Sequence, residues 1–312
     1  MLTRRSWLAS VLSLLARPAR AGVTEPLIVS EFSVPNPGRF GQKCLLLRPA
    51  RVPATEALPL VVLFHGLGET GSEALGIRAW YDRYGLPQAY ARLSSPPVER
   101  TLPRERYLTD ARLLELNREL SAEPFPDVAM LCPFTPNVFK QHPSAPFLDR
   151  YADYIERALL PAARVATPTL ATPAHGGVAG VSLGGYVALE VFLRKPGAFS
   201  ALSCVQAALS SAATERYAQR LAELPTLEGP RAIQLVTSSI DPFRDATQRL
   251  AKRLSERGVC ATLASPAGPH DQRFLREVGT LEMLLFQARA LREKPAGVAS
   301  GGDWTCHPPS SR

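Results

Sequence analysis

The sequence predicts an α/β protein in which a mostly parallel central sheet carries helices on both faces. Three observations support this: short apolar runs alternate with longer segments of helical spacing, inner runs are continuously apolar, and the composition is globular. The 312 residues are 46% hydrophobic and 21% charged, which excludes a disordered chain, and 5 Cys are too few for a disulfide scaffold. A chain of this length can bury one large core.

The expected strands are short and apolar. Residues 60–64 (LVVLF) form an unbroken apolar run, as expected for a strand that is buried on both faces. The other expected strands are 27–34, 43–47, 128–132, 176–181, 201–205, 232–237 and 259–264. Because no helical pattern separates the first two, we expect the sheet to begin with an antiparallel pair.

Segments with apolar residues at helical spacing separate or follow these strands. The expected helices are 147–164, 183–193, 212–224, 243–257 and 271–292. Residues 75–125 interrupt the alternation, since they are rich in Arg, Pro and Tyr and contain a helical stretch only near 109–120. They predict a cap-like insertion over one end of the sheet. The domain is expected to span 22–293, followed by an unstructured tail at 294–312.

The first 21 residues have the pattern of an export signal. Arg4 and Arg5 precede an apolar stretch from Trp7 to Ala16, and Ala19-Arg20-Ala21 fits a small-x-small cleavage site. The apolar stretch is too short to span a bilayer core of about 30 Å, so no stable membrane insertion is expected. The pattern predicts a twin-arginine signal peptide of residues 1–21 and a protein that is exported, periplasmic or secreted. A short amphipathic helix is the alternative interpretation.

The charge distribution excludes nucleic acid as an expected partner. The formal net charge is +8, but half of it comes from arginines in the first 21 residues. No basic run in the remaining chain is dense enough to bind a phosphate backbone. The expected partner is therefore a small molecule, while the oligomeric state is left open.

The cysteines show no metal-binding or redox pattern. The sequence contains no CxxC pair, so neither zinc nor another metal is expected. Cys44, Cys132, Cys204 and Cys260 lie in apolar runs and are expected to be buried free thiols, while Cys306 lies in the tail. One disulfide is left open, because exported proteins meet an oxidising environment.

Gly180-Val181-Ser182-Leu183-Gly184 matches the G-x-S-x-G pattern of a nucleophile elbow. An apolar strand is expected before it and a helix after it, which is the context that the motif requires. Such a turn lifts the Ser182 hydroxyl above the sheet, and the small flanking residues allow the close backbone approach. Ser182 is therefore the candidate nucleophile, with a simple Gly-Ser turn as the alternative.

His270 is the best placed of the 5 His to act as the general base. It follows the last expected strand, in Gly268-Pro269-His270-Asp271, and so lies at the carboxyl edge of the sheet, where α/β proteins bind ligands. The others lie at the opposite edge (His175), in a Pro-bounded loop (His142), in the tail (His307) or ahead of the serine in the chain (His65). A loop or cap histidine is the alternative role.

The acid is expected to follow the strand at 232–237. Asp241 lies at the carboxyl end of that strand and is followed by Pro242, so a helix N-cap is its alternative role. Asp245 lies in the turn into the next helix, and Asp271 is too close to its neighbour His270 to orient that ring. The resulting order of Ser182, Asp241 and His270 is the chain order of α/β-hydrolases.

These motifs, with Leu63-Phe64-His65-Gly66-Leu67-Gly68, resemble the putative-esterase branch of the α/β-hydrolases over residues 40–290. That branch includes feruloyl and enterochelin esterases, S-formylglutathione hydrolase and mycolyltransferases. The resemblance implies an oxyanion hole built from the backbone N–H of Leu183 and one from the turn His65-Gly66-Leu67, with Leu67 the expected residue. His65 is expected to shape this loop rather than act as a base.

The resulting hypothesis is a serine esterase that cleaves carboxyl esters or thioesters through an acyl-enzyme on Ser182, with His270 as base and Asp241 as acid. No cofactor is expected. Two alternatives remain: an acyltransferase that uses the same triad, and an exported binding protein that kept the fold without turnover. The acyl and alcohol groups of the substrate are not specified by the sequence.

Overall fold

The computed structural model describes residues 25–292 apart from 36, 39, 143 and 225–230. The expected signal peptide and tail therefore lie outside the described residues. The described part is built on an eight-stranded sheet in the order β1-β2-β4-β3-β5-β6-β7-β8. The strands are β1 (Leu27–Ser33), β2 (Lys43–Pro49), β3 (Leu60–Phe64), β4 (Ala129–Pro133), β5 (Gly176–Val181), β6 (Ala201–Val205), β7 (Ala232–Val236) and β8 (Thr262–Ala264).

The direction of the strands agrees with the expectation from the sequence. β1 pairs with β2 and β2 with β4 in antiparallel register, and every other pairing within the sheet is parallel. The mostly parallel sheet with an antiparallel start is thus confirmed. β8 is shorter than the expected strand at 259–264, because the N–H of Val259 still donates to Leu254 O and closes the preceding helix.

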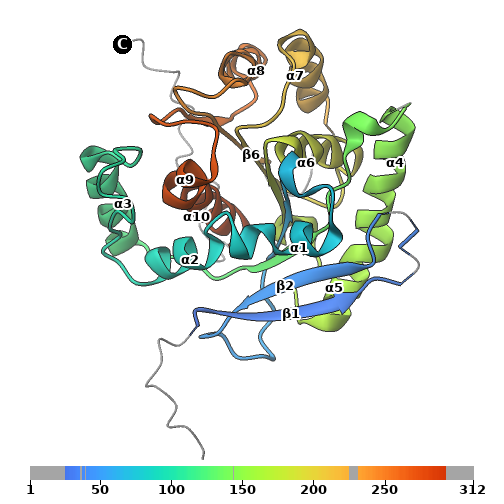
Figure 1. Cartoon of the computed structure of the whole chain (residues 1–312), viewed down its shortest axis with the longest axis horizontal. Helices are drawn as coiled ribbons and strands as arrows, with labels where there is room; N and C mark the ends of the chain where they lie inside the picture. Colours follow the sequence, from blue (N-terminus) through green and yellow to red (C-terminus); the bar gives the residue numbers. More distant parts are fainter. Residues whose placement is uncertain (1–24, 36, 39, 143, 225–230, 293–312) are drawn as a thin grey trace, which may run out of the picture.

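Helices cover both faces of this sheet (Figure 1). They are α1 (Glu73–Asp82), α2 (Leu86–Ser94), α3 (Asp110–Ala122), α4 (Ser144–Tyr154), α5 (Leu160–Ala166), α6 (Leu183–Arg194), α7 (Thr214–Ala222), α8 (Arg244–Glu256), α9 (Gln272–Phe274) and α10 (Thr280–Leu291). Shorter turns are η1 (Leu67–Glu69), η2 (Val138–Lys140), η4 (Pro173–His175) and η5 (Ser211–Ala213). The π-helical turns η3 (Ile155–Leu159) and η6 (Leu275–Gly279) continue α4 and α9.

The hydrophobic core has two parts, one on each face of the sheet. Neighbouring strand residues point to opposite faces, so Val62 of β3 packs in one part and Val61 in the other. One part joins the sheet to α4, α6, α7 and α8, and the other joins it to α1, α2, α3 and α10. This arrangement leaves the carboxyl ends of the parallel strands at a common edge, where the turns that follow them meet.

Residues 75–125 contain two helices beyond the helical stretch expected near 109–120. Ser72 begins α1 by accepting a hydrogen bond from the Leu75 N–H, and Pro87 lies in the first turn of α2. The side chains of Trp80 and Tyr90 are buried in the core against the sheet face. Most of α1 and α2 therefore belongs to the layer of helices on that face.

The cysteines separate into two kinds. Cys44, Cys132 and Cys204 are free and buried in inner strands, as expected. The expectation of a free thiol at Cys260 is wrong, because this residue is disulfide-bonded. It precedes β8 and is partly exposed, whereas the three free thiols lie inside the sheet.

No helix among the described residues has both the length and the apolar character to cross a membrane.

Candidate active site

Ser182 stands at a strained turn between β5 and α6. Its φ of 55° and ψ of −118° lie in a region that L-residues rarely adopt. A Cβ on Gly180 would lie 2.1 Å from Gly184 O, and one on Gly184 would lie 2.2 Å from Phe64 O. The two glycines of the motif are therefore required by close backbone contacts, and the turn holds the Ser182 hydroxyl at the carboxyl edge of the sheet.

The structure brings the three candidate side chains together. Ser182 Oγ lies 3.1 Å from His270 Nε2, and His270 Nδ1 lies 2.9 Å from Asp241 Oδ1. These residues follow β5, β7 and β8, whose carboxyl ends meet at one edge. The Asp241 side chain is fully buried, whereas that of His270 is 25% exposed. The arrangement allows a proton to pass from the hydroxyl to an imidazole that a carboxylate orients.

The Asp241 carboxylate is held by its own turn as well as by the histidine. Thr237 Oγ1 donates to Oδ2 over 2.7 Å, and the Phe243 N–H donates to Oδ1 over 3.1 Å. The second bond closes an Asx turn just ahead of α8. The N-cap of α8 is Phe243, without a side-chain capping bond, so the alternative role of Asp241 as a helix N-cap is wrong. Phe243 also packs edge-on against the His270 ring, with the ring centroids 5.6 Å apart.

The loop that carries His270 is bonded to the turn that carries Asp241. The Ile240 N–H donates to Gly268 O over 3.0 Å, and the Gly268 N–H donates to Ser239 Oγ over 3.1 Å. One residue earlier, the Ser239 N–H donates to Pro266 O over 3.0 Å. The two loops therefore form a single bonded unit, which fixes the distance between the acid and the base.

His65 lies in the turn after β3 and is fully buried. Its Nε2 accepts a hydrogen bond from the Thr135 N–H over 2.8 Å, so the proton is on Nδ1, which donates to Gly66 O over 2.9 Å. Burial lowers the pKa of His65 to about 4. This neutral ring joins the turns after β3 and β4, which is the loop-shaping position expected from the sequence.

Two of the three N–H groups of this turn are used within the protein. The His65 N–H donates to Thr135 Oγ1 over 3.0 Å, and the Gly66 N–H donates to Tyr84 Oη over 3.1 Å. Tyr84 Oη in turn donates to the buried carboxylate of Glu69. Burial of the ring, together with the contact with this carboxylate, raises the pKa of Tyr84 far above its ordinary value.

The third N–H of the turn belongs to Leu67, the first residue of η1, and Leu183 is the first residue of α6. N–H groups in the first turn of a helix have no partner within that helix, so both can bind an external oxygen. A Cβ on Gly66 would lie 3.8 Å from Ser182 Cβ, which shows how closely the turn approaches the serine.

Large apolar side chains surround this edge of the sheet. Leu67 is 49% exposed after β3, Phe139 is 51% exposed after β4, and Ile240 is 71% exposed after β7. Phe139 stacks on Tyr186, one turn after Ser182 in α6, with the ring centroids 5.7 Å apart. Exposed apolar side chains therefore follow three of the strands whose carboxyl ends lie at this edge.

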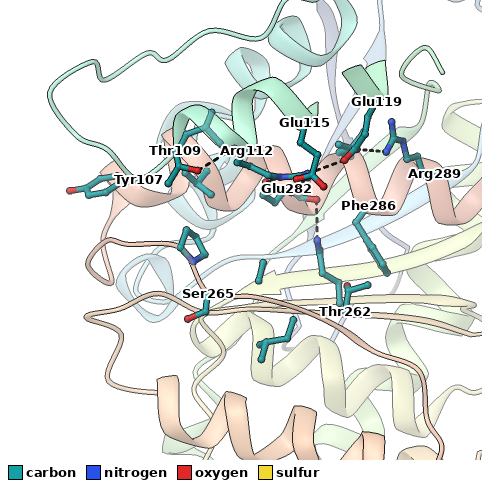
Figure 2. Close-up of a pocket in the computed structure, with 17 residues that line it drawn as sticks. Tyr107, Thr109, Arg112, Glu115, Glu119, Thr262, Ser265, Glu282, Phe286 and Arg289 are labelled. Carbon is teal, nitrogen blue, oxygen red and sulfur yellow. Dashed lines mark hydrogen bonds and ion pairs between the residues drawn. The ribbon is translucent and has the colours of Figure 1, made fainter. Parts of the chain in front are cut away.

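A separate cavity of about 500 Å³ lies between β8, α3 and α10 (Figure 2). Its charged groups pair with one another: Arg112 binds both carboxylate oxygens of Glu282, and Arg289 binds Glu119. None of Ser182, Asp241 and His270 lines it. The cavity and the catalytic candidates thus occupy different places in the fold.

Within the described residues no cluster of three or more His, Cys, Asp or Glu side chains is placed to hold a metal.

Sequence reasoning missed the residues that support the candidate triad. Thr237 carries no motif, and neither does Gln206, whose Nε2 donates to Ser238 Oγ and to Pro269 O beside the triad. Tyr84 was part of a segment that we expected to lie over the sheet. The signal that could have found the first two is their position: each is a polar residue at the carboxyl end of an apolar strand.

Comparison with known proteins places these observations in a family context. The family model described as "Putative esterase" matches residues 132–286, a span that contains Ser182, Asp241 and His270. No protein sequence with a curated description matches this chain.

Solved structures of esterases are similar to this fold at low sequence identity. A ferulic acid esterase is 14% identical, with a TM-score of 0.60, and the match covers 85% of this chain and 98% of that chain. S-formylglutathione hydrolase from Staphylococcus aureus is 15% identical, with a TM-score of 0.53 and coverage of 84% and 96%. Ferric enterobactin esterase from Salmonella typhimurium is 20% identical, with a TM-score of 0.53 and coverage of 84% and 58%. The likeness is one of fold.

Proposed function

We propose that this chain, which matches the putative esterase family over residues 132–286 and has the fold of solved esterases, is an ester hydrolase that acts through an acyl-enzyme on Ser182. His270 is the general base and acid in this proposal, and Asp241 orients its ring. The observation that carries the proposal is the hydrogen-bond chain from Ser182 Oγ through both His270 nitrogens to Asp241 Oδ1. The expected substrate is a small carboxyl ester or thioester.

The proposed reaction has two steps. Ser182 Oγ attacks the ester carbonyl carbon while its proton passes to His270 Nε2, and the imidazolium then gives that proton to the departing alcohol oxygen. Water next attacks the acyl-enzyme, gives a proton to His270, and releases the acid as Ser182 regains its hydrogen. Asp241 accepts the Nδ1–H bond throughout, which keeps Nε2 free to take the proton.

The developing negative charge on the carbonyl oxygen needs hydrogen-bond donors. We assign this role to the N–H groups of Leu183 and Leu67, because those of His65 and Gly66 are already bonded to Thr135 and Tyr84. Donors of this kind each contribute about 3 kcal/mol to transition-state stabilisation. The Leu183 N–H also lies at the positive end of the α6 dipole.

Labelling with a fluorophosphonate tests the proposal. We expect one covalent adduct on Ser182 in folded protein and none in Ser182→Ala, which should also lose turnover of p-nitrophenyl esters by about 10⁴-fold or more. Ser210→Ala, at an exposed serine, is the matched control. A wild-type protein that is folded but neither labelled nor active would overturn the proposal and favour a binding protein.

The choice of substrate and acceptor needs a second measurement. A panel of p-nitrophenyl esters of increasing acyl length would define the acyl group. Methyl ferulate belongs in the panel, because a ferulic acid esterase has a similar fold. Product analysis with an added alcohol separates hydrolysis from acyl transfer. Predominant formation of a new ester at millimolar alcohol would favour the acyltransferase alternative.

A further inference from the structure

Gln206 has an unusual backbone conformation next to the candidate triad. Among the described residues only Ser182 and Gln206 are non-glycine residues with positive φ, at 55° and 45°. Gln206 directly follows β6, and its side chain is buried, with 1% of the residue exposed. A long side chain in the left-handed region costs about 1–3 kcal/mol, so the surrounding structure must hold it there.

The backbone on either side of Gln206 holds the serine. The Ser182 N–H donates to Val205 O over 2.9 Å, and the Ala208 N–H donates to Ser182 O over 2.9 Å. The Gln206 N–H itself donates to Val236 O over 2.6 Å, at the end of the strand that leads to the acid. The bend at Gln206 therefore allows one short segment to bond to both the serine and the end of β7.

The Gln206 side chain reaches the two loops that carry the acid and the base. Its Nε2 donates to Ser238 Oγ over 2.7 Å and to Pro269 O over 2.9 Å. Ser238 O accepts the Asp241 N–H over 3.2 Å, and Pro269 directly precedes His270. One carboxamide group thus bonds to both loops, while the adjoining backbone bonds to the serine.

We propose that Gln206 is a positioning residue that holds the His270 loop in register with Ser182 and Asp241. The inference rests on the proposed esterase function, and Gln206 itself touches none of the reacting atoms. An amide nitrogen is suited to this task because it donates two hydrogen bonds without adding a charge beside the histidine. A displacement of about 1 Å at the base can lower the rate about 100-fold, so small losses of register matter.

Replacement of the amide tests this role. Gln206→Met keeps the length of the side chain and removes both donors, so we expect kcat to fall about 10- to 100-fold while KM changes less than about threefold. The rate of fluorophosphonate labelling at Ser182 should fall in parallel. The matched control is Gln234→Met on β7, because Gln234 is also buried and donates to a backbone oxygen, that of Glu282, outside the site.

A second variant separates the side chain from the backbone. Asparagine adopts positive φ more readily than glutamine, but its amide is one methylene shorter and cannot reach both acceptors. We expect Gln206→Asn to fold at least as well as Gln206→Met and still to lose kcat. Full activity in Gln206→Asn would overturn the proposal, because the backbone bend alone would then suffice.

The remaining outcomes are equally decisive. Equal loss of kcat in Gln206→Met and Gln234→Met at equal melting temperatures would assign Gln206 a purely structural role and overturn the proposal. If wild-type protein labels at Ser182 and Gln206→Met keeps wild-type kcat, only the positioning role fails. If wild-type protein does not label, the proposed function itself fails, so the two results cannot be confused.

Discussion

Two histidines at the same edge of the sheet have opposite surroundings. His65, after β3, is fully buried between backbone groups of Thr135 and Gly66, and burial lowers its pKa to about 4. His270, after β8, is 25% exposed at its side chain and lies between a carboxylate and a hydroxyl. One ring is locked by backbone partners, while the other has side-chain partners that can exchange a proton.

The comparison shows that the position of a histidine along the strand does not decide its role. Both residues follow a parallel strand, and both have each ring nitrogen hydrogen-bonded. The difference lies in the partners: a backbone N–H and a carbonyl fix one tautomer, whereas a carboxylate can stabilise a positively charged ring. The first arrangement suits a structural role, and the second suits the general base of the proposed reaction.

Removal of the His270 ring should produce the largest effect. In His270→Ala, the Ser182 hydroxyl loses its only bonded base, so we expect kcat for ester hydrolysis to fall about 10⁴-fold or more. The melting temperature should change little, because the ring is partly exposed and fills no core. Steady-state kinetics and thermal unfolding measure the two effects. Activity within tenfold of wild type would remove the distinction drawn between the two histidines.

Asp241→Asn should have the next largest effect. The amide oxygen can still accept the Phe243 N–H, but the side chain cannot hold the His270 ring in the tautomer that leaves Nε2 unprotonated. We expect kcat to fall about 10³- to 10⁴-fold with little loss of stability. Asp245→Asn, in the exposed first turn of α8, is the control. Wild-type kcat in Asp241→Asn would leave this residue with only its hydrogen bonds to Thr237 and Phe243.

His65 should affect the pH dependence of stability rather than catalysis. Its pKa is about 4 when folded and about 6.5 when unfolded, so between these pH values the unfolded chain binds a proton that the folded protein does not. As pH falls from 6.5 to 4, this residue should therefore remove about 3 kcal/mol from the free energy of unfolding, with little further loss below pH 4.

Urea unfolding across this pH range measures the effect. His65→Gln should lose that part of the pH dependence, while His142→Gln, at an exposed histidine, serves as the control. Where the His65 variant does not fold, NMR titration of the wild-type ring gives the same information. A His65 ring that becomes protonated near pH 6.5 in the folded protein would contradict the prediction.

The architecture could be predicted from the sequence, because the apolar pattern of each strand matches its burial in the sheet. Continuous apolar runs such as Leu60–Phe64 predict inner strands, and the elbow motif between a strand and a helix indicates where the sheet presents a side chain. Helices α1 and α2 were not predicted. Gly76 interrupts the pattern of α1, and α2 is short and directly follows Gly85. A Cβ on Gly76 would lie 2.4 Å from His65 Nε2. The glycine reflects a contact between distant segments.

The supporting residues of the site were beyond sequence reasoning for a related reason. Gln206 and Pro269 are distant in the chain, and nothing local in either predicts that an amide and a carbonyl will meet. One disulfide was left open, but Cys260 was expected to be a free thiol, because an apolar neighbourhood in the sequence resembles a buried strand. Apolar residues at a spacing of two or 3.6 show which face of a strand or helix is buried. The contacts of Gln206 and Cys260 lie in loops, and their partners are determined by how the strands and helices pack.

The three buried free thiols can be used to measure how often the central sheet opens locally. Burial raises the pKa of Cys44, Cys132 and Cys204, and they lie on β2, β4 and β6, so alkylating reagents can reach them only when the surrounding strands separate. The speed of their modification therefore reports how often different portions of the sheet come apart. Since the strands flank the elbow on both sides, the same experiment indicates whether a substitution near Ser182 disturbs the scaffold or only the chemistry.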